Sequence, residues 1–245
     1  MTTRTRYQNT ILALLAAIAL VFGGLLLYNR TQPGVMFREA FLKRQVTPEY
    51  TVYYGACKGE ETAIYVTPKT DGTLVQILAG AHRWEYIVSV WEGASHDRAY
   101  QNDTPVVITD VGGKELFRGY LAPNGYLIDE EGHLDPDFGV FVYTEYGNKN
   151  VWDDYEPSKL FVVKLALEPE LAYHGSIGMY LLMLFAAFCV AVDILFPEFY
   201  FQLKYMFSVR DPEPSDFYIA VQRLGWAIWP VLLAIGFGYA ATMLP

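Results

Sequence analysis

The densest group of possible metal ligands in this chain lies at residues 129–137, where five carboxylates surround His133. Calcium and other hard cations take several oxygen ligands, and an acidic turn supplies them. The spacing is not that of an EF-hand, and Pro136 stiffens the region that would have to wrap around an ion. We therefore interpret this segment as a solvated hairpin loop and predict no metal ligand in it.

Three adjacent residues, Ser95-His96-Asp97, have the residue types of a hydrolase triad. Adjacent side chains cannot line up as nucleophile, base and orienter, because a triad is assembled from separated positions. The chain also lacks the H-E-x-x-H and C-x-x-C metal motifs and a glycine-rich phosphate loop. The sequence therefore predicts no catalytic residue and no cofactor.

A carboxylate in an apolar segment gives a sharper expectation. Asp193 lies three residues before the end of the apolar run 177–196, and Arg223 precedes the next apolar run, 224–244. Because a charge at membrane depth is costly, it should face a partner or interfacial water. We expect an ion pair between Asp193 and Arg223 that fixes the register of a helical hairpin. A single acid without a second relay group does not favour ion conduction.

These two runs, together with residues 11–27, are each long enough to cross a hydrocarbon core about 30 Å thick as a helix. A segment that crosses the hydrocarbon core must satisfy its own backbone hydrogen bonds, and a helix does this within one segment. Arg4 and Arg6 precede the first run, but no small-x-small cleavage pattern follows it. The first run is therefore predicted to be an uncleaved anchor, and the lipid bilayer is the first expected partner.

The short connector between the last two runs carries Lys204 and Arg210, and basic residues in short loops favour the cytoplasmic side. Basic residues after the first run argue the other way, but long domains cross membranes largely regardless of charge. We expect a multi-pass cell-membrane protein with this organisation: a cytoplasmic tail (1–10), a first span (11–28), an acidic extracytoplasmic β-rich domain (29–175), a second span (176–196), a cytoplasmic interfacial segment with a helix start (197–222) and a third span (223–244).

The long polar block is strongly acidic. Residues 31–172 hold 12 Lys and Arg against 22 Asp and Glu, a net charge of −10. Such a block repels phosphate backbones, so nucleic acid is not an expected partner.

From residue 62 onward the block alternates apolar and polar residues, with turn pairs such as Asn124-Gly125 between the runs. Short strands about ten residues apart indicate an antiparallel sandwich or small barrel.

The same alternation predicts a strand at 160–167. Residues 34–43 have the pattern of a short amphipathic helix, and we expect the acidic, proline-containing segment 152–157 to be exposed.

The last helix has its own local signals. Ser215 follows a proline-rich stretch as a ready N-cap, and Asp216 suits the first turn of a helix. Small residues further along permit close packing against another helix. These residues are Ala234, Gly236, Gly238 and Ala240.

Residues 178–239 carry the pattern L-F-P, an aromatic-rich linker, then E-P-S-x-x-Y and R-x-G, which includes Pro197, Ser215 and Arg223. This pattern resembles an uncharacterised family of small two-helix bacterial membrane proteins. It departs from that family at Trp226, where a second glycine is frequent. The resemblance implies a membrane hairpin and a bacterial origin, and it assigns no activity.

Together these features predict an α+β membrane protein with three transmembrane helices and one extramembrane antiparallel β-rich domain. The favoured function is a non-enzymatic binding or assembly module whose partner is another membrane protein or a cell-envelope ligand. An accessory or regulatory subunit of a larger transporter is the alternative, and a membrane-bound hydrolase is the least favoured.

Overall fold

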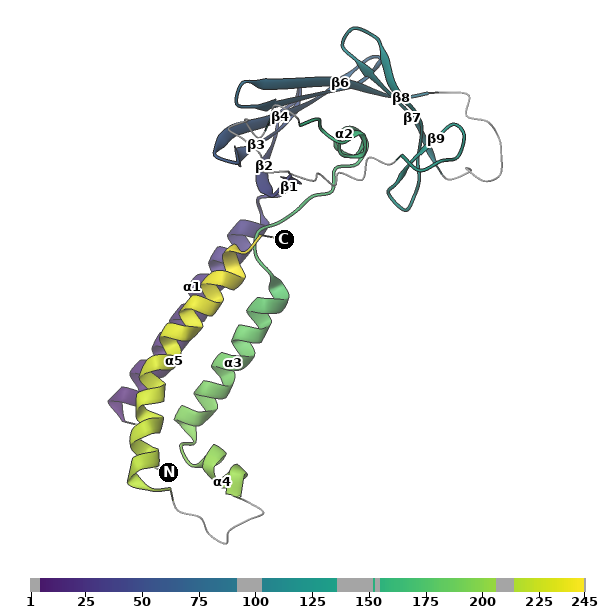
Figure 1. Ribbon diagram of the computed structural model, residues 1–245. Coiled ribbons are helices and arrows are strands. Elements are labelled where there is room, and N and C mark those ends of the chain that lie inside the picture. Colours follow the sequence, from purple (N-terminus) through teal and green to yellow (C-terminus); the bar gives the residue numbers. More distant parts are fainter. Residues whose placement is uncertain (1–4, 92–102, 136–151, 153–154, 206–213, 245) are drawn as a thin grey trace, which may run out of the picture. The chain divides into compact units, whose positions relative to one another are not determined.

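The computed structural model describes residues 5–91, 103–135, 152, 155–205 and 214–244 (Figure 1). The chain divides into a helical unit, Met1–Gln32 with Tyr173–Pro245, and a sheet unit, Pro33–Ala172. The triad-like residues 95–97 and the end of the acidic loop, 136–137, lie outside the described residues.

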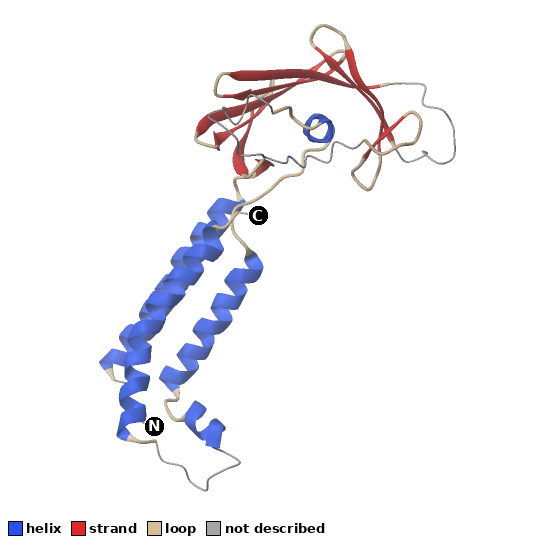
Figure 2. Cartoon of the chain, in the orientation of Figure 1, coloured by secondary structure: helices blue, strands red, loops and turns tan. Residues whose placement is uncertain are grey.

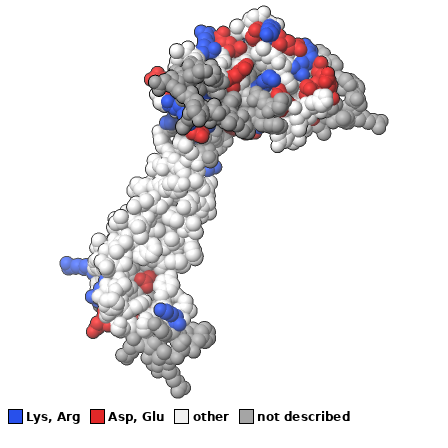
Figure 3. Space-filling view, viewed as in Figure 1, with Lys and Arg blue, Asp and Glu red and all other residues white. Residues whose placement is uncertain are grey.

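The helical unit contains three long apolar helices: α1 (Arg6–Arg30), α3 (Ile177–Leu195) and α5 (Asp216–Thr242). All three are long and apolar enough to cross a membrane. Only 17%, 11% and 33% of their most apolar windows are buried inside the protein. Figure 3 shows few charged side chains on the visible face of these helices between their two ends. Most of their apolar surface is therefore exposed.

Helices α1 and α5 run parallel to each other. The Tyr7 hydroxyl donates to the carbonyl of Arg223 (3.1 Å) near the start of both helices. The Asn29 amide donates to the carbonyl of Ala241 (2.9 Å) near their other ends. With a rise of 1.5 Å per residue, Arg223 and Ala241 are about 27 Å apart along α5, close to the thickness of a hydrocarbon core.

Helix α3 runs antiparallel to the other two. Its last turn accepts a hydrogen bond from the Gln8 amide at the carbonyl of Ile194 (3.0 Å). At its start, the backbone N–H of Ser176 donates to the carbonyl of Ala240 (2.8 Å). The start of α3 thus satisfies a carbonyl at the end of α5 that the helix itself leaves unpaired. A short helix, α4 (Phe199–Tyr205), follows α3, and the Tyr200 hydroxyl bonds back to α3 at the Cys189 carbonyl (3.1 Å).

The sheet unit is one antiparallel sheet of nine strands in chain order, curved around helix α2 (Lys159–Leu167) (Figure 2). An α+β chain with an antiparallel sheet is confirmed, but the described strands form one open sheet rather than the expected sandwich or small barrel. The strands are β1 (Gly34–Phe37), β2 (Ala40–Val46), β3 (Thr51–Cys57), β4 (Glu60–Lys69), β5 (Gly72–Ala79), β6 (His82–Val90), β7 (Thr104–Asp110), β8 (Glu115–Leu121) and β9 (Leu127–Asp129).

The core of the sheet unit lies between one face of the sheet and α2. Alternate strand residues such as Ile64, Ile77 and Val106 are fully buried there. The α2 residues Val162 and Val163 pack in the same cluster. The sheet therefore buries one face against a single helix, as period-two strands require.

Two local sequence predictions are wrong. Residues 34–43 form the hairpin of β1 and β2 rather than a helix, with Arg38 in its turn at a φ of 52°. Residues 160–167 lie in α2 rather than in a strand, and the Ser158 hydroxyl accepts the N–H of Phe161 as N-cap (3.1 Å). Residues 160–167 are apolar except at Lys164, so their pattern fits either period. In residues 34–43, two short apolar runs flank the charged pair Arg38-Glu39, and such short runs also fit either period.

The expected exposure of 152–157 is also wrong at its aromatic residues. Trp152 is 1% exposed and stacks on Phe37 with ring centroids 6.1 Å apart. Tyr155 is buried and meets Trp152 edge-on (5.5 Å). The Arg38 guanidinium lies over both rings, 4.7 and 4.5 Å from their centroids. The Arg38 guanidinium and these aromatic rings therefore pack together at one side of the core.

Candidate functional site

The carboxylate of Asp193 is the centre of a polar cluster between α3 and α5. Its Oδ1 accepts a hydrogen bond from Gln222 Nε2 (2.9 Å), and its Oδ2 accepts one from Trp226 Nε1 (2.6 Å). The same Gln222 amide also donates to the carbonyl of Pro197 (2.7 Å). Trp226 is only 4% exposed, so its indole N–H needs this acceptor.

The expected partner of Asp193 was Arg223, and the structure does not bring the two together. No ion pair joins Asp193 and Arg223, both of which are described residues. Successive residues of a helix point about 100° apart, so Arg223 does not point in the direction in which Gln222 reaches Asp193. Gln222 and Trp226 are four residues apart and share one helix face, which is the signal that could have identified them.

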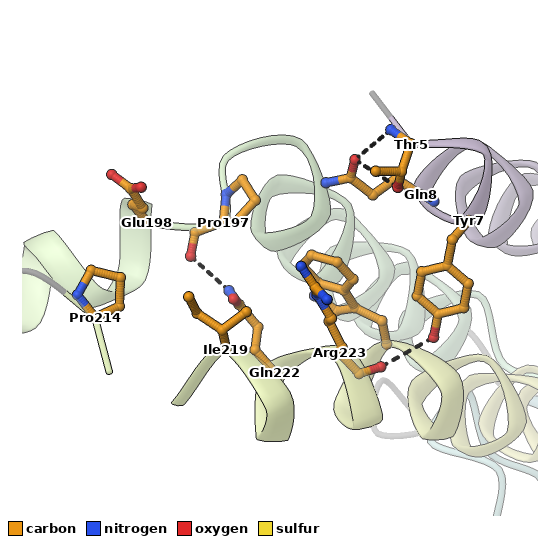
Figure 4. Close-up of a pocket in the computed structure, with 10 residues that line it drawn as sticks. Thr5, Tyr7, Gln8, Pro197, Glu198, Pro214, Ile219, Gln222 and Arg223 are labelled. Carbon is orange, nitrogen blue, oxygen red and sulfur yellow. Dashed lines mark hydrogen bonds between the residues drawn. The ribbon is translucent and has the colours of Figure 1, made fainter. Parts of the chain in front are cut away.

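A cavity of about 530 Å³ opens beside this cluster (Figure 4). Small-molecule sites commonly have volumes of about 300–1,000 Å³. The lining residues come from the start of α1, the corner between α3 and α4, and the first turns of α5. They are Thr5, Tyr7, Gln8, Pro197, Glu198, Pro214, Ile219, Gln222, Arg223 and Trp226.

Helix caps fix the two sides of this cavity. At the start of α1, Thr5 and Gln8 form a capping box: the Thr5 hydroxyl accepts the Gln8 N–H (3.3 Å), and the Gln8 side chain accepts the Thr5 N–H (2.9 Å). At the start of α5, Ser215 is the N-cap, and its hydroxyl accepts the N–H of Tyr218 (3.2 Å). Asp216 lies in the first turn of α5, where a negative charge suits the helix dipole.

The cavity contains one charge of each sign. The guanidinium of Arg223 has neither a hydrogen bond nor an ion pair among the described residues, and the residue is exposed. Glu198 is exposed, and its Oε2 accepts a hydrogen bond from Gln202 Nε2 (3.2 Å). Figure 4 shows the two side chains on separate elements, Glu198 after α3 and Arg223 on α5. A zwitterionic or phosphate-containing ligand fits this pair of charges better than an apolar one.

The four small residues of α5 pack inside the helical unit. A Cβ added at Gly236 would collide with Met183 of α3, and one added at Gly238 would approach Phe22 of α1 to 3.3 Å. Ala240 is fully buried and Ala234 is half-buried. Gly236 is thus occupied by a contact within the chain, which leaves less of this surface for an external partner.

In the sheet unit, Asp129, Glu131 and His133 place one ligand atom each within 4.8 Å of one another. Asp129 Oδ1 accepts the backbone N–H groups of Glu131 (2.9 Å) and His133 (2.8 Å). The hydrogen bond from the His133 backbone is the main reason that the pKa of Asp129 is lowered. This carboxylate therefore already has a structural role in closing the turn after β9.

Of the three long helices around the cavity, only α3 and α5 lie in a segment that matches a protein family. Residues 181–243 match a family of unknown function, DUF6199. The DUF6199 match runs from α3 to the end of α5, and the resemblance drawn from residues 178–239 falls on the same segment. It includes Asp193, Gln222 and Trp226 but neither α1 nor the sheet unit. No curated protein and no solved structure matches the chain.

Proposed function

We propose that this chain is an integral membrane protein that holds an acidic β domain on the extracytoplasmic side as a non-enzymatic binding or assembly module. The observation that carries the proposal is the apolar surface that the three helices leave exposed. On α3 alone, Leu181, Phe185 and Phe188 are 57%, 64% and 64% exposed. Exposed apolar surface of this extent is stable against lipid and costly in water.

The hydrogen bonds at the two ends of the helical unit support the topology. The starts of α1 and α5 lie together with the end of α3, and the chain leaves for the sheet unit from the opposite end, after Arg30. Lys204 and Arg223 belong to the short connector side, which the positive-inside rule assigns to the cytoplasm. The sheet unit is then extracytoplasmic, and its partner is another membrane protein or a cell-envelope ligand.

Fractionation tests the membrane assignment. The full chain should stay in the membrane pellet after extraction with alkaline carbonate and should float with liposomes in a density gradient. Recovery of the intact chain in the aqueous fraction without detergent would overturn the proposal.

Labelling of single cysteines tests the orientation. In a chain with both native cysteines replaced by alanine, Lys69→Cys exposes a thiol at the end of β4 and Lys204→Cys exposes one on α4. In intact cells, a membrane-impermeant maleimide should label the first thiol and should reach the second only after permeabilisation. The opposite pattern would invert the topology and leave the membrane assignment intact.

A further inference from the structure

The cavity of the helical unit lies at the depth where lipid headgroups meet hydrocarbon, if the proposed membrane insertion holds. The bonds from Tyr7 to Arg223 and from Gln8 to Ile194 place the start of α1 and the end of α3 level with Arg223, which lies seven residues after the first residue of α5. The apolar runs of α1 and α5 begin within about a turn of this level, at Ile11 and Leu224. The indole of Trp226 lines the cavity, and tryptophan is typical of this interfacial layer.

The polar groups of the cavity divide into those already engaged and those available. The side chains of Tyr7, Gln8 and Gln222 donate to backbone carbonyls or to Asp193. The Arg223 guanidinium has no such bond among the described residues. Its planar fork of donors matches the oxygens of a phosphate in a bidentate manner. A phosphate is thus the group that the cavity is best equipped to hold at this position.

Glu198 adds a second requirement. Its carboxylate lines the same cavity from the α3–α4 corner and accepts one hydrogen bond, to Oε2, from Gln202. A carboxylate disfavours a ligand of purely negative charge and favours one that also carries an ammonium. We propose that the cavity binds the headgroup of one phospholipid with a primary amine, with its phosphate at Arg223 and its ammonium at Glu198.

Native mass spectrometry of the full chain in mild detergent tests this site with three lipids of equal acyl chains. The probes are phosphatidylethanolamine, phosphatidylcholine and phosphatidylglycerol. The wild-type chain should retain one phosphatidylethanolamine in preference to the other two. Arg223→Gln should weaken its retention by about tenfold or more, the effect of losing a charge-assisted contact.

Two further variants separate this site from general charge effects. Arg6→Gln removes the same charge at the same end of the helical unit, but Arg6 does not line the cavity, so retention should not change. Glu198→Gln should abolish the preference for the amine headgroup over phosphatidylglycerol while the phosphate contact persists. Because Glu198 is exposed on another element, this variant also provides a test if Arg223→Gln does not fold.

The outcomes distinguish this inference from the membrane assignment on which it rests. Equal losses in Arg223→Gln and Arg6→Gln, or equal retention of all three lipids by the wild type, would overturn the headgroup site. The fractionation experiment would still report membrane insertion in that case. Recovery of the wild-type chain in the aqueous fraction would overturn both.

Discussion

Replacement of Asp193 is the most direct test of how the helical hairpin is held together. The structure gives this carboxylate two neutral donors, Gln222 and Trp226, and neither a hydrogen bond nor an ion pair joins the described residues Asp193 and Arg223. Asp193→Ala should therefore destabilise the helical unit, whereas Arg223→Gln should leave its stability nearly unchanged. An ion pair between Asp193 and Arg223 predicts instead that both substitutions cost about the same.

The size of the effect follows from the two hydrogen bonds. Hydrogen bonds between helices in a membrane are worth about 0.6 kcal/mol on average and at most about 1.7 kcal/mol. Leaving the buried indole N–H of Trp226 without an acceptor costs about 1–3 kcal/mol. We expect Asp193→Ala to lower the free energy of unfolding by about 2–3 kcal/mol. Asp193→Asn keeps one acceptor oxygen and should cost about half as much.

The measurement is reversible unfolding of the full chain in mixed micelles by titration with sodium dodecyl sulfate, followed by tryptophan fluorescence. The exchanged variant, Asp193→Arg with Arg223→Asp, provides the sharpest control. It should be at least as unstable as Asp193→Ala, because Gln222 and Trp226 would then face a cation. A stable exchanged variant, together with a costly Arg223→Gln, would refute the hydrogen-bond network and restore the ion pair.

Three further substitutions test the packing. Gly23→Ala in α1 forces a methyl group against the Tyr180 hydroxyl and should cost about 1–3 kcal/mol, whereas Gly24→Ala has open space and should be neutral or stabilising by up to about 1 kcal/mol in the same titration. Trp152→Ala empties the aromatic cluster of the sheet unit and should cost about 3–5 kcal/mol by thermal unfolding, and no loss would show that this cluster is not part of the core. Burial raises the pKa of the Cys57 thiol, so iodoacetamide at pH 8 should alkylate it only after unfolding. Because the pKa of Cys57 is higher in the folded chain than in the unfolded chain, its contribution to stability is fully present below the ordinary thiol pKa and is lost as the pH rises through the folded-state pKa. Fast alkylation of Cys57 in the native chain would contradict its burial.

The sequence was most informative where one physical requirement dominates. Three apolar runs of sufficient length predict three long helices, because nothing else accounts for so many consecutive apolar residues. Strands β4 to β8 were predictable because their alternation is regular and because pairs such as Gly112-Gly113 and Asn124-Gly125 supply turns with positive φ.

The hairpin of β1 and β2 was not predictable in this way. Its turn places Arg38, not glycine or asparagine, at a positive φ. The strain at this residue is compensated by tertiary contacts, since its guanidinium packs over Trp152 and Tyr155, which are more than a hundred residues away. A rule based on local turn residues has no access to such a contact.

The candidate site shows the same limit at the level of single side chains. Hydropathy identifies Asp193 as a residue that needs a partner, and charge alone nominates Arg223. Which residue faces Asp193 depends on the rotation of α5 about its axis, and a shift of one residue exchanges Arg223 for Gln222. That rotation is set by packing, as at Gly236 against Met183, and only the folded chain reveals it.

The kinds of hydrogen bond between the helices separate α1 from the hairpin that matches DUF6199. Within that hairpin, Asp193 of α3 accepts hydrogen bonds from two side chains of α5, so the hairpin requires an acceptor on α3 and side-chain donors at the facing positions of α5. Among the described residues, each hydrogen bond that joins α1 to α3 or α5 ends on a backbone carbonyl, as at Arg223, Ile194 and Ala241. Every helix offers carbonyls whatever its sequence. These hydrogen bonds therefore constrain only the residue that donates, whereas the packing of Gly23 against Tyr180 and of Gly238 against Phe22 makes the fit of α1 depend on particular residues of α3 and α5.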